Sequence, residues 1–395
     1  MKLDTEILLR DLYRLDPAGA QMMEELQHHV QRFVMAADAL GDIPAAFWDG
    51  VPVERMNRMN LPVEYGGMPL TATALRRAVT FERIGRICPA LPMSMPGPGL
   101  SMPPVLSLGT PAQRTAYFER FCGQARPVWG AFAITEPQGG SDATTMRTVA
   151  RADGDDFILD GEKCFITSGA RASAVVVFAT LDPAKGRFGV RAFLVERGTP
   201  GFRIDRSEDM LGLRASQLSV LSFQACRVPA ASMLGHTGRR GPLIDAFTGA
   251  QRAWDYMRPA LAAGINGTCA GILAHARHCL DEGRAPLTRA QVEAAHATLG
   301  PFQARVHAAQ LLALRAAWKF DRGERASLDA SLAKATSATL AMDLAHRLAA
   351  LLPLQAASRG DPLEKFVRDA KAFDILEGTG DMQRLMIARA FQEAA

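Results

Sequence analysis

The chain has 395 residues, of which 48% are hydrophobic and 22% charged, a composition typical of soluble globular proteins with two or three domains. Its net charge of +4 is spread along the sequence without a long basic run, and no run of about 18 apolar residues occurs. Composition and charge therefore give no support for a nucleic-acid-binding or membrane-spanning protein.

Residues 1–16 mix acidic and basic side chains and lack the apolar core of a secretory signal. The six cysteines form no CxxC pair and have no companion histidine at metal-ligand spacing. We therefore expect a cytoplasmic protein with reduced thiols, without a metal site and without a nucleic-acid or membrane partner.

Residues 1–128 are predicted to form an N-terminal helical domain, because apolar residues recur at helical spacing over long runs. Helix-breaking residues interrupt these runs at Gly66-Gly67 and in the proline-rich stretch 92–104. The methionines of that stretch suit an irregular apolar cavity, but core packing is the simpler use for them.

Residues 129–240 have the character of a β domain, with short strand-like runs separated by glycine and proline. Asp160-Gly161 is a hairpin signal between the runs at 157–159 and 163–167. Further runs follow at 175–178, 190–195 and 218–228. This spacing favours an antiparallel sheet or a small barrel.

Residues 241–395 are helical again, with alanine-rich periodicity through 311–318 and 328–352. Gly264, Gly267 and Gly271 give one helix a face of minimal bulk, against which another backbone or a ring can pack closely. The expected fold class is therefore α+β, with an N-terminal helical domain, a central antiparallel β-barrel-like domain and a C-terminal four-helix bundle.

Two helices are predicted to meet near the C-terminus, at the break Gly378-Thr379-Gly380. Thr379 is a good cap for the second helix, and Asp381 suits the positive end of its dipole. Glu377 lies at the junction, where burial between apolar runs would raise its pKa and suit it to act as a general base on a carbon acid. A surface glutamate that ends a helix explains the same pattern more simply.

A second informative stretch, residues 133–142, contains two glycines flanked by the hydroxyl groups of Thr135 and Ser141. Such a loop exposes backbone N–H groups that can approach an anion or the edge of a flavin. Taken alone, its Gly-Gly-Ser-Asp segment is also a common turn.

Three stretches resemble the acyl-CoA dehydrogenase family, and the resemblance extends over essentially the whole chain. They are Thr135-Glu136-Pro137-Gln138-Gly139-Gly140-Ser141-Asp142, Arg258-Pro259-Ala260-Leu261-Ala262-Ala263-Gly264, and Arg368-Asp369-Ala370-Lys371 followed by Leu376-Glu377-Gly378-Thr379. The resemblance implies an FAD-dependent enzyme that converts an acyl thioester to its trans-2-enoyl form. Glu377 would be the catalytic base, and Met257 occupies the position at which some members carry theirs.

The resemblance also implies which residues hold the cofactor and the substrate. Phe165-Ile166-Thr167 resembles the family's Trp-Ile-Thr, with a ring that shields the flavin but lacks the indole N–H donor. The implied cofactor-binding residues are Phe132, Ile134, Thr135, Gly140, Ser141, Phe165, Ile166, Thr167, Thr379 and Asp381. The implied substrate-binding residues are Ser141, Asp255, Arg258 and Gly378, with Arg258 orienting the region of the catalytic glutamate.

Two family motifs that bind the adenine half of FAD across a subunit interface are absent. Their positions fall on Gly283-Arg284-Ala285-Pro286-Leu287 and on Ala350-Leu351-Leu352-Pro353-Leu354. FAD would then be held less tightly, held by other residues, or bound without the usual tetramer. The inserted segment 236–241, with Arg239 and Arg240, is either a source of new phosphate contacts or, more simply, a solvated loop.

Several functions fit this pattern, and dehydrogenation of an acyl-CoA is the first of them. The alternatives are the same reaction on an acyl-carrier-protein thioester, a flavin oxidase or monooxygenase, and a non-catalytic binding member. The implied partners are the thioester substrate, an electron acceptor such as electron-transfer flavoprotein, and further copies of the chain in a homodimer or homotetramer.

Overall fold

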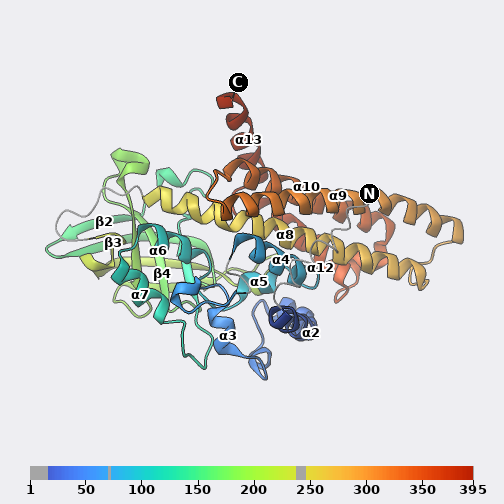
Figure 1. Ribbon diagram of the computed structural model, residues 1–395, viewed down its shortest axis with the longest axis horizontal. Helices are drawn as coiled ribbons and strands as arrows, with labels where there is room; N and C mark the ends of the chain where they lie inside the picture. Colours follow the sequence, from blue (N-terminus) through green and yellow to red (C-terminus); the bar gives the residue numbers. More distant parts are fainter. Residues whose placement is uncertain (1–16, 70–72, 237–245, 395) are drawn as a thin grey trace.

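The computed structural model describes residues 17–69, 73–236 and 246–394. Figure 1 shows the sheet at one end of the molecule and the long C-terminal helices at the other, with the N-terminal helices along one side. Residues 1–16 and the Arg239-Arg240 pair lie outside the described residues, so the expectations for them stay predictions. The α+β class and the order helical, β, helical are confirmed.

The first helical region consists of short helices around one longer one. Thr73 caps α4 by accepting a hydrogen bond from the Arg76 N–H, and Thr110 and Gln113 form a capping box at α7. Met95 and Met102, from the proline-rich stretch, are buried in the core. The helices are α2 (Pro17–Leu40), α3 (Val53–Arg58), α4 (Ala74–Gly85), α5 (Ala90–Ser94), α6 (Met102–Leu108) and α7 (Pro111–Glu119).

The central domain is one sheet of seven strands in the order β1-β4-β2-β3-β7-β6, with β5 also paired to β4. Most neighbours are antiparallel, but β1 and β2 both pair with β4 in parallel. The β1 register runs from Gly130 opposite Ala174 to Ala133 opposite Val177, and Val149 of β2 lies opposite Thr180. No hairpin sets the direction of β1, because it follows a helical region. The strands are β1 (Gly130–Ala133), β2 (Val149–Asp153), β3 (Asp156–Thr167), β4 (Ala174–Thr180), β5 (Val190–Glu196), β6 (Phe202–Ser207) and β7 (Leu218–Pro229).

The hairpin predicted at Asp160-Gly161 is wrong. Strand β3 runs through both residues, and the turn lies earlier, between Asp153 and Asp156. Gly161 marks a register shift against β7, and a Cβ atom there would lie 2.5 Å from the Thr148 hydroxyl oxygen. The glycine is thus explained by a close approach inside a strand, not by a turn.

The C-terminal region consists of long helices packed side by side, as Figure 1 shows for α8, α9 and α10. The small face predicted on the first of them packs against the backbone at the end of α4. A Cβ atom at Gly267 would lie 2.0 Å from the Glu82 carbonyl oxygen, and one at Gly271 would lie 2.1 Å from that of Arg86, the residue after α4. The helices are α8 (Ala246–Asp281), α9 (Arg289–Asp321), α10 (Ser327–Leu351), α11 (Pro353–Ala357), α12 (Pro362–Ile375) and α13 (Gly380–Ala394).

All six cysteines are free thiols. Within the described ranges, no helix combines the length and the apolar character needed to cross a membrane. The same residues contain no group of three or more His, Cys, Asp or Glu side chains suited to a metal ion.

Candidate active site

Glu377 lies on the turn between α12, which ends at Ile375, and α13, which begins at Gly380. Its φ of 57° is in the left-handed region, which a residue other than glycine enters at a cost of about 1–2 kcal/mol. Gly378 follows with a φ of 90°. Interactions around the turn must therefore hold it in place.

Three side chains from three different helices hold this turn through its backbone carbonyl groups. Arg258 Nε of α8 donates to the Glu377 carbonyl over 3.0 Å. Gln383 Nε2 of α13 donates to the carbonyls of Glu377 and Gly378, each over 3.2 Å. Lys334 Nζ of α10 donates to the carbonyls of Asp374, over 2.9 Å, and Gly378, over 2.8 Å.

These donors bind backbone carbonyl groups, not the Oε2 atom of the Glu377 side chain. Within the described residues, Oε2 is buried and has no hydrogen-bond partner. Burial raises the pKa of the Glu377 carboxyl, although the nearby charges of Arg258 and Lys334 oppose the rise. A buried carboxylate with a raised pKa and a free oxygen is suited to take a proton from carbon.

The glycines of the turn are required by the packing around it. A Cβ atom on Gly378 would lie 2.7 Å from Gln383 Nε2, and one on Gly380 would lie 2.2 Å from a carboxylate oxygen of Asp374. Thr379 accepts a hydrogen bond from the Met382 N–H at the start of α13, as predicted for a cap. Asp381 is exposed and pairs with Arg384 over 3.0 Å.

The Arg-Asp pair that begins the C-terminal motif anchors α12 to distant parts of the chain. Arg368 forms ion pairs with Asp38 of α2, at 2.6 Å, and with Glu364, at 2.7 Å. Asp369 Oδ1 accepts a 2.6 Å hydrogen bond from the Leu213 N–H. These contacts fix the helix that presents Glu377.

The second predicted site, the loop after β1, is fixed by a buried ion pair. Lys163 Nζ lies 2.6 Å from Glu136 Oε1 and also donates to the Ile134 carbonyl over 3.2 Å. Glu136 accepts further hydrogen bonds from the N–H groups of Arg147, over 2.6 Å, and Thr148, over 2.9 Å. The loop is thereby joined to β3.

Burial acts on both members of this ion pair. It would raise the pKa of Glu136, but the Lys163 charge and the hydrogen bonds to the carboxylate outweigh it and lower that pKa to about 2. Burial lowers the pKa of Lys163 to about 8 against the opposing charge of Glu136. We expect both groups to be charged at neutral pH.

The residues predicted to face the flavin differ in their surroundings. Phe165 is 55% exposed and has a φ of 55°, at a register shift between Lys163 and Ile166. Such an exposed aromatic ring beside the loop suits a planar cofactor. Phe132 is half-buried, and its ring lies 5.1 Å from that of Phe178 in the core.

The remaining predicted residues divide between buried and exposed positions. Ile134 and Ile166 are buried, Thr135 and Thr167 are half-buried, and Gly140 and Ser141 are exposed. The Thr135 carbonyl accepts a 3.0 Å hydrogen bond from the Cys164 N–H, which brings the loop beside the Phe165 segment. Within the described residues, no hydrogen bond joins the loop after β1 or the Phe165 segment to the Glu377 turn.

Asp255 was predicted to contact the substrate, but both of its oxygens already have partners. Oδ1 accepts from Gln251 over 2.9 Å, and Oδ2 accepts from the Ser327 hydroxyl over 2.7 Å. The Arg258 guanidinium lies 3.8 Å away. Asp255 thus links α8 to the start of α10.

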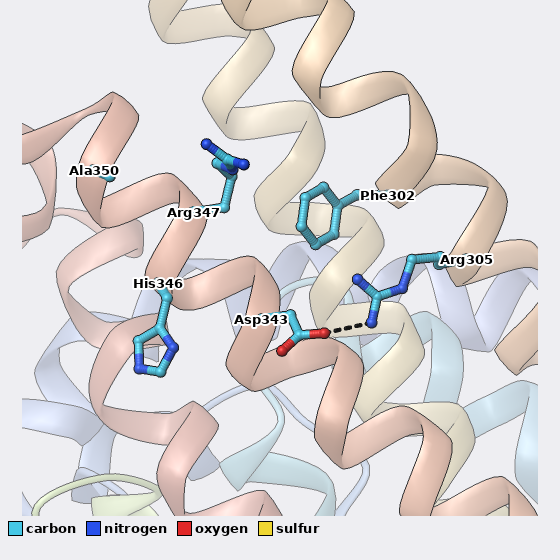
Figure 2. Close-up of a pocket in the computed structure, with 6 residues that line it drawn as sticks. All are labelled: Phe302, Arg305, Asp343, His346, Arg347 and Ala350. Atoms are coloured by element: carbon cyan, nitrogen blue, oxygen red, sulfur yellow. Dashed lines mark hydrogen bonds and ion pairs between the residues drawn. The ribbon is translucent and has the colours of Figure 1, made fainter.

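The two positions of the missing adenine-binding motifs offer neither a stacking phenyl ring nor a glycine pair. Pro353 begins α11 and has no N–H group to donate, and Leu354 is 57% exposed. Ala350 lines an open groove of about 400 Å³ between α9 and α10 (Figure 2). The other lining residues are Phe302, Arg305, Asp343, His346 and Arg347, and Arg305 pairs with Asp343 over 2.5 Å. The exposed Phe165 ring and the loop after β1 fit the isoalloxazine end of FAD. The family's pattern for the adenine end is not met at these two positions.

Sequence reasoning missed three residues of the site: Lys334, Gln383 and Lys163. Gln383 lies six residues after Glu377, in a Gln-Arg-Leu-Met-Ile-Ala-Arg segment that also resembles the family's C-terminal signature, so its position was a usable signal. Lys163 precedes the Phe-Ile-Thr segment, but nothing in the sequence pairs it with Glu136. Lys334 lies in an alanine-rich helix with no motif around it.

Three family models match the chain in sequence order. The acyl-CoA dehydrogenase N-terminal domain matches residues 20–124, the middle domain matches residues 131–226, and the C-terminal domain matches residues 247–392.

Individual proteins are similar over most of the chain. Human mitochondrial short-chain specific acyl-CoA dehydrogenase is 35% identical over 84% of this chain and 78% of its own length. Cyclohex-1-ene-1-carbonyl-CoA dehydrogenase of Geobacter metallireducens is 32% identical over 84% of this chain and 85% of its own. The solved structure of butyryl-CoA dehydrogenase from Megasphaera elsdenii, 27% identical, has a TM-score of 0.83 over 97% of this chain and 98% of that one.

Proposed function

The chain belongs to the acyl-CoA dehydrogenase family of oxidoreductases, and from this premise we propose that it dehydrogenates an acyl-CoA between the α- and β-carbons, with Glu377 as the base. The observation that carries the proposal is the buried Glu377 Oε2, which has no hydrogen-bond partner in the part of the chain that the structure describes, on a turn held by three helices. A surface glutamate that merely ended a helix would be solvated.

The protein's own groups have three tasks in this reaction. Glu377 accepts the α-proton, and its raised pKa brings its proton affinity closer to that of a carbon acid. The donors on its backbone carbonyls fix the position of the carboxylate, since proton removal depends on alignment. The Glu377 N–H is proposed to polarise the thioester carbonyl, an effect worth about 3 kcal/mol for a well-placed donor.

FAD, when bound, supplies the acceptor for the hydride that leaves the β-carbon. We propose that Thr135, Gly140, Ser141, Phe165 and Thr167 hold its ring system. The exposed ring of Phe165 and the hydrogen bond between the Thr135 and Cys164 backbones support this assignment.

Further parts of the proposal follow from the family resemblance. An acyl-CoA is favoured over a carrier-protein thioester because the two relatives and the butyryl-CoA dehydrogenase structure carry CoA substrates in their names. Electron-transfer flavoprotein is the proposed acceptor, and a homodimer or homotetramer the proposed assembly. The matched models support domain divisions at 128/129 and 240/241.

The test is anaerobic reduction of the purified, FAD-reconstituted protein by a panel of acyl-CoA and acyl-carrier-protein thioesters. We expect a yellow protein whose visible absorbance bleaches with a suitable acyl-CoA. The variant Glu377→Gln should keep the colour and lose the bleaching by a factor of about 10²–10⁴. Glu393→Gln, at an exposed position of α13, is the matched control. Full reduction of Glu377→Gln at the wild-type rate contradicts the assignment.

A further inference from the structure

Lys334 is a buried lysine with an unusual set of partners. It lies about two turns into α10, and its side chain has 0% exposure. The other buried lysines, Lys163 and Lys365, each form an ion pair with a carboxylate, Glu136 and Asp369 respectively. The Lys334 ammonium instead donates to two backbone carbonyls, and no ion pair of the described residues includes it. Burying a charge without a counter-ion is unfavourable, so the position needs an explanation.

The two carbonyls that Lys334 contacts lie on either side of Glu377. Asp374 is in the last turn of α12, where carbonyl groups lack partners within the helix and a positive charge is favourable. Gly378 is the residue directly after Glu377. One ammonium group therefore bridges the whole turn, at 2.9 Å on one side and 2.8 Å on the other.

The other two donors at the turn do not make this bridge. Arg258 contacts the Glu377 carbonyl alone, and Gln383 contacts the adjacent carbonyls of Glu377 and Gly378. Lys334 is the donor that joins the end of α12 to the residue beyond the base. Its loss would take this donor from the Asp374 carbonyl and remove one of the two side-chain donors to the Gly378 carbonyl.

The charges around the pair set the direction of the electrostatic effect. Glu377 is influenced by Arg258 of α8 and Lys334 of α10, both of which lower its pKa against the larger effect of burial. Lys334 is influenced first by burial, which lowers its pKa to about 8, and then by Asp374, Arg258, Glu377 and Arg384. Lys334 is thus positively charged at pH 6–7, and it favours the carboxylate form of Glu377.

We propose that Lys334 is a positioning residue for the catalytic base, which bridges the Glu377 turn through two backbone carbonyls and favours the ionised carboxylate. The inference rests on the proposed role of Glu377. It assigns Lys334 no contact with the substrate or the cofactor.

The first test is the pH dependence of anaerobic flavin reduction in Lys334→Met and Lys334→Gln. Methionine keeps the length of the side chain without donors or charge, whereas glutamine keeps a donor without charge. In both variants we expect the acid limb of the pH profile to move to higher pH. Lys334→Met should also slow reduction at the plateau by about tenfold to a hundredfold, because the turn is released, and Lys334→Gln should slow it less.

Lys365→Met is the matched control, because it removes another buried lysine that lies about three helical turns before Glu377 on α12. It should lower stability and leave the acid limb in place. A Lys334→Met or Lys334→Gln protein that is folded and yellow, with the wild-type acid limb, overturns the proposal.

A second measurement needs neither turnover nor a Lys334 variant. In protein labelled with ¹³C at lysine Cε, the Lys334 resonance should shift as Glu377 titrates, and this step should be missing in Glu377→Gln. A Lys334 resonance with the same pH profile in both proteins overturns the electrostatic coupling. If no thioester reduces the wild-type flavin, the proposed function fails on its own, while the resonance experiment still decides whether Lys334 responds to Glu377.

Discussion

The Arg258 guanidinium donates a 3.0 Å hydrogen bond to the backbone carbonyl of Glu377, while the Oε2 carboxylate oxygen of the same residue stays buried and, within the described residues, without a partner. An arginine bonded to the carboxylate itself would hold the proton affinity of that group low. By bonding to the main chain, Arg258 fixes the position of the proposed base without bonding to its Oε2 atom.

The first prediction concerns the pH dependence of the reductive step. Because burial raises the pKa of Glu377 above its ordinary value of 4.5, the rate constant of flavin reduction should rise with pH over a range above 4.5 and then level off. Stopped-flow absorbance under anaerobic conditions measures it. A rate that is already constant at and below pH 4.5 would show that no raised carboxyl pKa controls the step.

The same carboxyl should make the protein less stable near neutral pH. Its pKa in the folded protein lies above that in the unfolded chain, so the stability linked to this group is complete below pH 4.5 and is lost as the pH rises through the folded value. Glu377→Gln should therefore raise the free energy of unfolding at pH 7 by about 1–3 kcal/mol. Urea denaturation at pH 7 and pH 4 checks it, and the gain should be smaller at the lower pH.

Gly378→Ala should displace Glu377, because it strains the backbone of the turn and pushes on the side chains that donate to it. The residue has a φ of 90°, and the new Cβ atom would lie 2.7 Å from Gln383 Nε2 and 3.4 Å from a terminal guanidinium nitrogen of Arg258. We expect a loss of about 1–2 kcal/mol in stability and up to about a hundredfold in the rate of flavin reduction.

Gly360→Ala is the matched control for this substitution. Gly360 has a φ of 95°, and a Cβ atom there would have nothing within 4 Å. The control should lose stability to a similar extent without losing the rate. Equal rate losses in the two variants would mean that backbone strain alone, and not displacement of the donors, explains the effect at Gly378.

Lys163→Met should destabilise the loop after β1, because it leaves the buried Glu136 carboxylate without its counter-ion. Breaking a buried ion pair from one side costs about 3–5 kcal/mol. The double variant Lys163→Met/Glu136→Gln should recover part of this loss. In the wild type, the contribution of the Glu136 carboxylate is complete above pH 4.5 and is lost as the pH falls toward 2. Thermal unfolding measures the loss of stability and its dependence on pH. FAD titration measures whether the loop still binds the cofactor.

Phe165→Leu should weaken FAD binding without unfolding the protein. The ring is 55% exposed, so its removal should change stability by less than about 0.5 kcal/mol. Loss of an aromatic contact to the flavin corresponds to about a threefold to tenfold weaker affinity. Phe188→Leu, at a ring that is 65% exposed, should change neither quantity. Unchanged FAD affinity in Phe165→Leu would remove this residue from the proposed flavin site.

The break between the last two helices was predictable, because glycine breaks helices and threonine and aspartate favour helix N-termini whatever the tertiary structure. Thr379 caps α13 as expected. The family resemblance pointed to Arg258 as a residue near the turn. Lys334 was not predictable, since it binds backbone carbonyls, which carry no sequence information. The order of the domains followed from a change of periodicity that extends over many residues.

The misplaced hairpin in the β domain has a physical cause. A glycine in a strand-rich segment signals either a turn or a close approach of two chains, and sequence spacing does not distinguish them. Gly161 serves the close approach to Thr148, so the hairpin was misplaced by several residues. The parallel pairing of β1 with β4 depends on where the preceding helical region places the start of β1, and no local sequence pattern indicates this position.

The dependence of the Glu377 turn on Gln383 has a consequence for how the enzyme is made. Chains fold from the N-terminus as they emerge from the ribosome, so the sheet and the first helices are complete long before the final residues are translated. The Glu377 carboxylate acquires its fixed geometry only when the last helix is available. A product of premature termination in α12 or earlier would therefore carry the proposed flavin loop without the proposed base.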